Sequence, residues 1–495
     1  MTTVTKKTPV YNRLKDNVDY LKSRLDIGPH NFDVGNRDLK LMGKDLSIFY
    51  SNSLVETQIV VALIQNMYFM ATSHHGTRNV FDLLKTHVTH EQVSEVKSLD
   101  EVVDKMLSGL IIVFIDGESV GIVVDTRHYP GRTPEEPDVE KVIRGSKDGF
   151  TENIIENAGL LRRRIRDERY RNELLQVGER SKTDVCISYL KDVVNPDLLK
   201  SVREEIKKIN VDGIPMADKS IEEFILKQGW NPYPMVRYTG RPDVAAAHLL
   251  EGHIIIITDT SPSAIIIPVT LFHHVQHAEE YRQVVAVGAV TRWIRFIAIF
   301  TSVFLLPLWI LLVQHHLLPD NLNFIGPNKH DYHLPLLLQI ILAELGIEIL
   351  RMAAVHTPTA LSTALGLIAA VLIGQIAIQV GIFLPEVILY AAVAAIGGYA
   401  TPSYELGVAN KITRLILTVL ASVFGVPGFV IGVTVFIVYL ARVQNLNIPY
   451  LWPLIPFNPT GFYNIMIRRA MPTARIRPSI LKPQDKYRMP KPDNS

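Results

Sequence analysis

The stretch LLLQIILAELGIEILRMAAV (residues 336–355) decides the fold, because it is long and apolar enough to cross a lipid bilayer. A hydrocarbon core of about 30 Å needs roughly 20 apolar residues in a helix. Three charged side chains nevertheless lie inside it: Glu344, Glu348 and Arg351. Spacings of four and seven residues place all three on one face of a helix. A charge at the bilayer centre costs about 2.5–3.5 kcal/mol on insertion scales, so we expect this face to meet a bundle interior or water.

Two interpretations of these charges stay open. Glu348 and Arg351 have the i, i+3 spacing of an ion pair, which offsets part of the cost of burying them. Glu344 then needs another partner or water. In the structural interpretation the charges hold helices together, and Arg351 reaches toward the membrane interface. In the functional interpretation they lie beside an ion path.

The surrounding composition predicts a membrane domain behind a large soluble half. The chain has 495 residues, 48% of them hydrophobic, and residues 293–456 are nearly all apolar, whereas residues 1–290 have an ordinary globular composition. Apolar runs predict five membrane segments: 293–314, 334–355, 361–384, 386–400 and 411–442. The sequence FGVPGF (424–429) interrupts the last run, which predicts either a kinked helix or a pair that turns back.

Positive charge predicts the orientation. Arg292 and Arg295 precede the first segment, Lys411 and Arg414 lie between the fourth and fifth, and the tail carries about six net positive charges. Cytoplasmic loops are enriched in such residues, so both the N-terminal half and the tail are expected in the cytoplasm. Two ends on one side require an even number of crossings, which five segments satisfy only if one of them turns back. The run IPYLWPLIPFNP (448–459) predicts an interfacial segment with aromatic side chains at headgroup level.

The N-terminal half predicts two similar small α/β subdomains. MLSGLIIVFIDGESVGIVV (106–124) and LLEGHIIIITDTSPSAIIIP (249–268) both run Leu-x-Gly, strand, acidic turn, strand. Such self-similarity indicates an internal repeat. Between the hairpins, residues 153–176 predict one charged helix whose arginines form a solvated face.

The predicted organisation has six parts and no catalytic site. The parts are, in order, a disordered linker (1–35), a first cytosolic α/β subdomain (36–150), a helical linker (151–180), a second subdomain (181–285), a transmembrane helical domain (290–460) and a basic cytoplasmic tail (461–495). No phosphate-binding loop, nucleophile elbow, zinc-protease motif or cysteine pair is present in the sequence. We therefore expect no enzyme, no cofactor and no metal, and the net charge of +2 gives no sign of nucleic-acid binding.

Four separated blocks resemble the GerA family of spore germination proteins, in its A-subunit branch. They are GERSKTDVCISYLKDVVNPDLLKSVREEIKKINVDGI (178–214), RPDVAAAHLLEGHIIIITDTSPSAIIIP (241–268), GLIAAVLIGQIAIQVGIF (366–383) and ATPSYELGVANKITRLIL (400–417). The resemblance covers roughly residues 40–470. One departure is the second hairpin turn, where nutrient-receptor members usually carry Asp-Gly and this chain has Asp259-Thr260.

The resemblance implies a multi-pass protein of the inner spore membrane that self-associates into a ring, a pentamer, around a cation-conducting path. It also implies a small membrane partner protein of the germination apparatus, contact with membrane lipid, and a cytosolic half that assembles and gates the complex. The pore-lining candidates lie on the third segment: Ile368, Val371, Gln375 and Gln379. Glu344 and Glu348 would lie behind or beside them and tune the preference for cations.

Two other functions remain open. In a secondary transporter Glu344 would be a coupling site for protons or cations. In a membrane-anchored scaffold for germination proteins, substitutions of Gln375 or Glu344 would leave ion flux unchanged.

Overall fold

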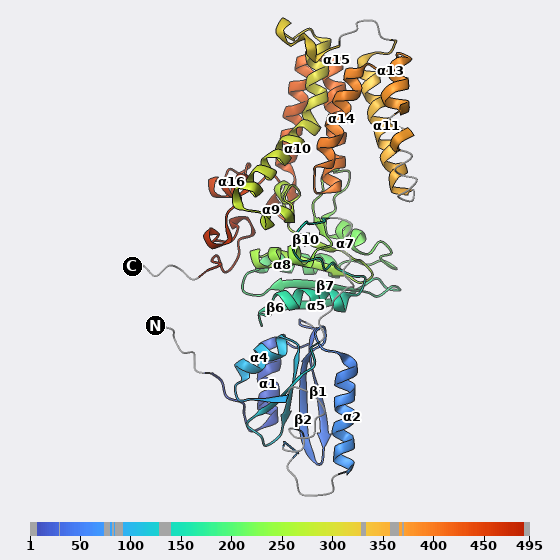
Figure 1. The fold of residues 1–495 in the computed structure, drawn as a ribbon. Helices are drawn as coiled ribbons and strands as arrows, with labels where there is room; N and C mark the ends of the chain where they lie inside the picture. Colours follow the sequence, from blue (N-terminus) through green and yellow to red (C-terminus); the bar gives the residue numbers. More distant parts are fainter. Residues whose placement is uncertain are drawn as a thin grey trace, which may run out of the picture. The chain divides into compact units, whose positions relative to one another are not determined.

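The chain divides into two compact units. The computed structural model describes residues 7–28, 30–73, 80–81, 84, 93–127, 140–327, 333–356, 366–368 and 371–489. Unit 1 comprises Met1–Lys227, Val236–Pro268 and Met471–Ser495, and unit 2 comprises Gln228–Met235 and Val269–Ala470. Figure 1 colours both units along the sequence.

Unit 1 contains two antiparallel sheets of five strands each. The first has the order β1-β2-β4-β5-β3 and the second β6-β7-β9-β10-β8 (Figure 1). The strands are β1 Val34–Leu41, β2 Lys44–Ser51, β3 Val93–Val96, β4 Leu110–Ile115, β5 Gly121–Asp125, β6 Tyr170–Val177, β7 Thr183–Leu190, β8 Arg237–Thr239, β9 Ile254–Thr258 and β10 Ala264–Ile267. The two predicted hairpins are thus confirmed as β4-β5 and β9-β10.

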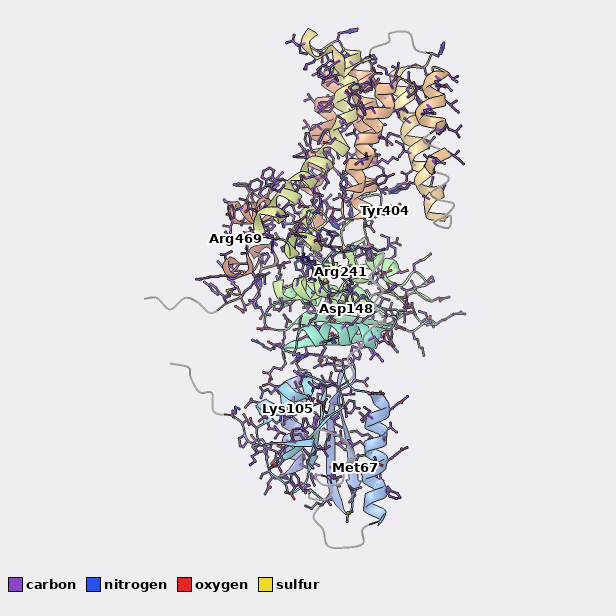
Figure 2. All side chains as sticks on the ribbon, viewed as in Figure 1. Met67, Lys105, Asp148, Arg241, Tyr404 and Arg469 are labelled. Carbon is purple, nitrogen blue, oxygen red and sulfur yellow. The ribbon has the colours of Figure 1, made fainter. Side chains whose placement is uncertain are left out.

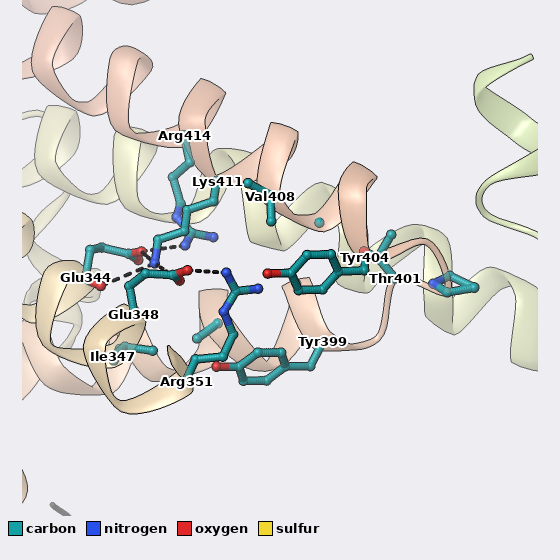
Figure 3. Close-up of a pocket in the computed structure, with 14 residues that line it drawn as sticks. Glu344, Ile347, Glu348, Arg351, Tyr399, Thr401, Tyr404, Val408, Lys411 and Arg414 are labelled. Atoms are coloured by element: carbon teal, nitrogen blue, oxygen red, sulfur yellow. Dashed lines mark hydrogen bonds and ion pairs between the residues drawn. The ribbon is translucent and has the colours of Figure 1, made fainter. Parts of the chain in front are cut away.

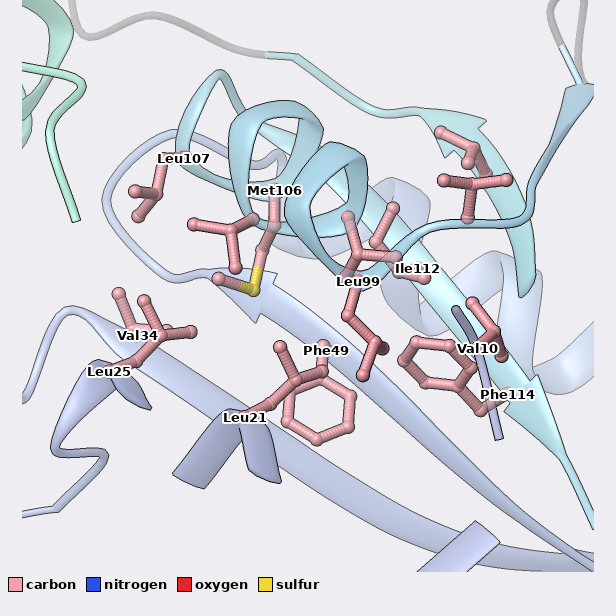
Figure 4. Packing of buried hydrophobic residues seen from close by; sticks show 14 of the residues in the cluster. Val10, Leu21, Leu25, Val34, Phe49, Leu99, Met106, Leu107, Ile112 and Phe114 are labelled. Atoms are coloured by element: carbon pink, nitrogen blue, oxygen red, sulfur yellow. The ribbon is translucent and has the colours of Figure 1, made fainter. Parts of the chain in front are cut away.

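Helices cover these sheets and close their cores. They are α1 Leu14–Leu25, α2 Thr57–Ser73, α4 Leu99–Leu107, α5 Ile154–Arg164, α6 Pro196–Lys207, α7 Ala217–Leu226 and α8 Pro242–Glu251, with η4 Met471–Thr473 and η5 Ser479–Leu481 near the C-terminus. Figure 4 shows Leu21 of α1 and Leu99 of α4 packed on Phe49 and Phe114 of the first sheet. These two rings meet edge to face with centroids 5.8 Å apart. On the other face of the sheet, Met67 of α2 (labelled in Figure 2) is buried in the second core cluster.

The two halves of unit 1 repeat one topology. Each runs helix, two strands, helical region, strand, helix, two strands, and the strand orders match element by element. Gly109 and Gly252, which are 143 residues apart, end the helices α4 and α8 with positive φ angles of 94° and 105°. Only glycine adopts that conformation without strain. Two similar α/β halves are therefore present, as predicted, but they begin earlier than residues 36 and 181, with α1 at Leu14 and with α5 at Ile154.

Hydrogen bonds repeat along with the topology. The side chain of Asn17 accepts from the backbone N–H of residue 11 at 2.8 Å and donates to its carbonyl at 2.7 Å. Asn157 makes the same two bonds to residue 151, at 2.8 and 2.6 Å. Asp116 and Asp259 lie in the two hairpin turns, and each accepts a hydrogen bond from the backbone N–H of a residue that begins a helix. Asp116 accepts from Leu14, which begins α1, and Asp259 accepts from Ile154, which begins α5. The repeat thus extends from strand order to single side chains.

The single helix predicted over residues 153–176 is wrong in its second half. Helix α5 ends at Arg164, and residues 170–177 form strand β6, paired with β7 along its whole length. The strand ladder therefore overrides a helical pattern of charges. The arginines are not all solvated either, since Arg162 is fully buried and binds Asp33 of the first half at 2.9 Å. Residues 151–180 thus contribute core elements to unit 1.

Residues after Met471 fold onto unit 1. The backbone N–H of Gln484 donates to the carbonyl of Val193 at 3.0 Å. Arg477 donates to the carbonyl of Leu250, and Arg488 pairs with Glu251. The charged C-terminal stretch is therefore part of this unit over its described length.

Unit 2 is a helical bundle with a short β-ribbon. Its elements are η1 Leu271–His273, α9 Ala278–Arg282, α10 Val285–Gln314, η2 Asp320–Ile325, α11 Leu336–His356, the π-helical turn η3 Leu372–Ile376, α13 Ala377–Gln379, α14 Pro385–Tyr399, α15 Tyr404–Arg442, β11 Gln444–Asn445, β12 Ile448–Pro449 and α16 Pro459–Met466. Small residues of α14, such as Ala391 and Ala394, pack against Leu306 and Ile310 of α10. Within the described residues two helices, α10 and α15, are long and apolar enough to cross a membrane, and α14 is a shorter apolar helix.

Helix α15 folds back on itself at Gly425. This residue has φ 62° and ψ −144°, which interrupts the helix. A Cβ on Gly432 would lie 2.9 Å from the side chain of Leu417, whereas a straight helix would separate the two by about 22 Å. Tyr233 confirms the reversal, because its hydroxyl lies 2.7 Å from that of Thr413 while its ring contacts Phe436 across a centroid distance of 6.0 Å. Of the two alternatives for the fifth segment, the structure therefore has the pair that turns back.

Candidate functional site

Charged side chains from two helices meet in unit 2 to form the candidate site. Helix α11 presents Glu344, Glu348 and Arg351, and α15 presents Lys411 and Arg414 (Figure 3). The three-residue spacing on α15 places both cations on one face. Since Glu344 meets Arg414 and Glu348 meets Lys411, the first half of α15 runs antiparallel to α11.

The inner part of the site is a buried ion pair. The Nη2 atom of Arg414 lies 2.6 Å from Oε2 of Glu344, and the two side chains are 3% and 2% exposed. Arg414 also donates to the carbonyl of Ser302 in α10 at 2.5 Å and to that of Ala394 in α14 at 3.4 Å. One guanidinium thus joins α10, α11, α14 and α15.

The outer part of the site is more open. Lys411 lies 2.7 Å from Glu348 and 3.6 Å from Glu344, so it bridges both carboxylates. Arg351 donates to Glu348 and places its guanidinium carbon 4.8 Å from the centre of the Tyr404 ring. The i, i+3 pair expected on α11 is therefore present. From inside to outside the charges alternate in sign, and we call these five charged residues the charge ladder.

A small cavity with both charged and apolar side chains in its lining adjoins the ladder. It has a volume of about 160 Å³ and is lined by all five charged residues together with Tyr399 and Thr401. Two buried polar atoms beside it, Oε1 of Glu344 and Nε of Arg414, have no hydrogen-bond partner among the described residues. The cavity has room for about five water molecules at roughly 30 Å³ each, and water satisfies such atoms. The cavity is thus large enough to hydrate the ladder, which has one more cation than carboxylates.

The partners of Glu344 were not predicted, because Lys411 and Arg414, at the start of the fifth predicted segment, were interpreted only as charges that orient the chain. The structure starts α15 earlier, at Tyr404, where the hydroxyl of Ser403 accepts from the N–H of Leu406 at 3.3 Å. A serine three residues before a helical N–H is a capping signal, so this earlier start was visible in the sequence.

The four pore-lining candidates lie apart from the charge ladder. Ile368 is 54% and Val371 41% exposed, and Gln375 and Gln379 are exposed as well. Among the described residues, none of the four belongs to the lining of the charged cavity. Their side chains are instead exposed on residues 366–368 and on the helical stretch 371–379. Whether they line a pore stays a prediction.

Comparisons with known proteins converge on one family. A family model described as Bacillus/Clostridium GerA spore germination protein matches residues 19–480. Stage V sporulation protein AF of Bacillus subtilis is 54% identical over 98% of both chains. The uncharacterized membrane protein YfkQ of the same organism is 28% identical over 95% of this chain and 91% of its own. The crystal structure of the N-terminal domain of the A subunit of the Bacillus megaterium spore germinant receptor GerK3 is 25% identical and covers 53% of this chain and 96% of that one, with a TM-score of 0.42, too low to bear on the fold.

Proposed function

Because this chain belongs to the Bacillus/Clostridium GerA family of spore germination proteins, we propose that it is a membrane subunit of a cation channel that promotes ion release during endospore germination. The channel would be a ring of subunits, a pentamer, in the inner spore membrane. A small membrane partner protein would join the ring, and the N-terminal half would lie in the cytoplasm.

The apolar surface of unit 2 supports a membrane location. Ile297 and Phe300 on α10 are 62% and 58% exposed, and Ile416 and Ile431 on α15 are 54% and 62% exposed. Large exposed apolar patches mark membrane or protein contacts. Because α15 supplies two antiparallel segments, five predicted segments become six. An even number returns both ends of the bundle to one side, as the positive charges require.

The exposed amides of Gln375 and Gln379 are the observation that carries the channel proposal. No hydrogen bond joins either amide to another described residue. An amide in hydrocarbon without a hydrogen bond costs several kcal/mol, roughly 2–7 by reference state. Lipid is therefore an unfavourable neighbour for this face, and water or a second subunit is a favourable one. Placed toward a ring axis, the two amides would line a narrow aqueous path with Val371 and Ile368 beside them.

We assign the charge ladder a clamping role in this channel. Glu344 and Glu348 each contact at least one cation within 2.7 Å. Carboxylates that are already paired bind a passing cation less well than free ones, so a direct part in ion selection is disfavoured. The ladder instead fixes α11 against α15 behind the pore wall.

One observation favours a second candidate, a secondary transporter. Oε1 of Glu344 is buried, its side chain lines a cavity large enough for water, and this oxygen has no hydrogen-bond partner among the described residues. A carboxylate oxygen in that position is a suitable place to load and unload a proton.

Current recordings in planar bilayers test these proposals. Purified protein, with and without a co-expressed membrane partner, is expected to give discrete cation currents. Gln375→Leu and Gln379→Leu should change the conductance, whereas Gln375→Asn, which keeps an amide, should change it less. Slow saturable flux that Glu344→Gln abolishes, without discrete currents, would point to a transporter. Correctly inserted protein that gives no ion flux at all would contradict both the channel and the transporter and favour the scaffold function.

A further inference from the structure

Unit 2 carries an exposed apolar surface between α15 and the end of the bundle. We call it the elbow surface. It consists of Leu454, Ile455, Phe457, Tyr463, Ile467 and Arg469. Phe457 is 65% and Tyr463 46% exposed. Aromatic and aliphatic side chains exposed together on a folded unit call for a partner.

The sequence predicts an interfacial segment over residues 448–459, and Leu454, Ile455 and Phe457 of the elbow surface lie in it. The two other aromatic rings of that segment do not face outward. Tyr450 is fully buried and packs on Tyr233, with ring centroids 6.5 Å apart, and Trp452 is only 9% exposed. Protein therefore covers these two rings, and their depth at headgroup level stays a prediction. Their burial leaves the following residues outside, up to α16, whose N-cap Asn458 accepts from the N–H of Gly461 at 2.8 Å.

The elbow surface is fixed to the start of α10. Arg292 of α10 donates to the carbonyls of Asn464 and Ile465 in α16, at 3.1 and 2.8 Å. The same guanidinium binds the buried Glu280 at 2.7 Å. Just after α16, Arg468 donates to the carbonyl of Tyr281 at 2.7 Å. The position of α16 along α10 is thus determined by buried contacts.

In the membrane location proposed above, that position lies at the edge of the bilayer. Helix α10 has 30 residues and is about 45 Å long, which exceeds a hydrocarbon core of about 30 Å. The uncharged apolar part begins after Arg295, so this part fills the core and the first turns project from it. Arg292 lies three residues before that edge, about 5 Å along the axis. Headgroup layers are about 5–8 Å deep, so the contact with α16 is at headgroup level.

The charges around the elbow surface are mostly positive. Arg469, labelled in Figure 2, lies with its guanidinium carbon 5.2 Å from the centre of the exposed Tyr463 ring. Arg282 is exposed as well, while Glu280 is buried under two arginines. Glu279 is the nearby carboxylate that opposes them. Arginine beside aromatic and aliphatic side chains is the composition of helices that lie in a bilayer interface and attract anionic lipid.

We propose that the elbow surface is an anchor that binds anionic phospholipid in the headgroup layer. Phe457 and Ile455 enter the acyl boundary, and Arg469 pairs with lipid phosphate. The proposal rests on the membrane location in the proposed function but not on ion conduction. It implies that lipid charge helps to set the position of α10 in the bilayer.

A fluorescence experiment tests the anchor. Cys186 is the single cysteine of the chain and is buried, so a cysteine placed at position 457 takes up a dye selectively. Full-length Phe457→Cys protein is labelled and inserted into nanodiscs of phosphatidylcholine with increasing phosphatidylglycerol. A spin-labelled headgroup lipid serves as quencher. Met216→Cys is the matched control, because Met216 is a similarly exposed apolar residue (71%) of unit 1.

We expect the dye at position 457 to be quenched more strongly as phosphatidylglycerol increases, and the dye at position 216 to be unaffected. Adding Arg469→Gln should weaken the apparent affinity for phosphatidylglycerol about fivefold, the value of one basic residue near an anionic surface. Equal quenching in both lipids, or none at position 457, would overturn the proposal. Protection of position 457 by a second copy of the chain, seen as dye–dye self-quenching, would overturn it in favour of a protein contact. Inserted protein gives this readout even if its bilayer currents are silent.

Discussion

Removing either partner of the Glu344–Arg414 pair should destabilise unit 2 strongly, while removing both should not. Arg414→Met leaves Glu344 buried with only Lys411 nearby, 3.6 Å away. Breaking a buried pair from one side costs about 3–5 kcal/mol, because an uncompensated charge stays in the interior. The remaining lysine offsets part of that cost, so we expect the lower end, about 3 kcal/mol.

The double variant Glu344→Leu/Arg414→Met removes both charges. Replacing a buried ion pair by apolar side chains of similar volume is often neutral or stabilising. Arg414 also bonds two carbonyls, whose loss costs about 1 kcal/mol. With about 3 kcal/mol for each single variant and about 1 kcal/mol for the double variant, the coupling energy between the two sites should be about 5 kcal/mol.

Unfolding in mixed detergent micelles measures these free energies. Trp309 is buried in the same bundle and gives part of the fluorescence signal. Arg180→Gln is the control, since Arg180 faces Asp212 with 82% and 77% of the two side chains exposed, and its midpoint should not move. If the double variant loses as much stability as the two single variants together, the argument for a buried, mutually compensating pair is refuted.

Three further predictions follow from single side chains. Gly425→Ala should lower the free energy of unfolding by about 1–3 kcal/mol, because the backbone conformation at this position favours glycine and a Cβ would lie 3.0 Å from the ring of His315. Gly398→Ala, which has open space around the new Cβ, should leave the thermal unfolding midpoint unchanged. Asn17→Ala and Asn157→Ala should each lower the free energy of unfolding by a similar amount, about 1–3 kcal/mol, because each amide makes the same pair of hydrogen bonds to the backbone. Urea unfolding that shows a large loss of stability at only one of the two sites would contradict the structural equivalence of the two halves. Burial raises the pKa of the Cys186 thiol to about 12 from its usual 9. Because the unfolded chain therefore loses this proton at lower pH than the folded chain, the free energy of unfolding should fall as pH rises from 9 to 12. Iodoacetamide at pH 8 should label the thiol only after denaturant is added, and labelling of the folded chain would contradict its burial.

Local sequence signals predicted much of unit 1. The two β-branched hairpins depend on neighbours in the sequence, and these were recognised. Strand β6 was missed because four charged or amide residues interrupt its apolar pattern, and its pairing with β7 decides that it is a strand. Side-chain burial depends on partners far away in the sequence. Arg162 has the composition of a solvated helix, and its contact with Asp33 lies 129 residues away.

The same distinction holds for the candidate site. The pair on α11 lies within one helical turn, so spacing alone predicted it. The partner of Glu344 is 70 residues away on another helix, and no pattern within α11 identifies it. Counting the charges on each apolar segment would have narrowed the candidate partners of Glu344, because two carboxylates on one segment and two cations on another can neutralise each other.

The C-terminal stretch that folds onto unit 1 affects the order in which the protein is made. Strands and helices of unit 1 leave the ribosome first, but residues 477–488, which bond to α8 and to the loop after β7, leave it after the whole helical bundle. Unit 1 therefore waits, incomplete, while the bundle is synthesised and inserted. Unit 1 can therefore fold completely only after the helical bundle has been translated. A chain cut short by a premature stop lacks residues 477–488 and leaves exposed the surface of unit 1 that they cover, where chaperones and proteases act.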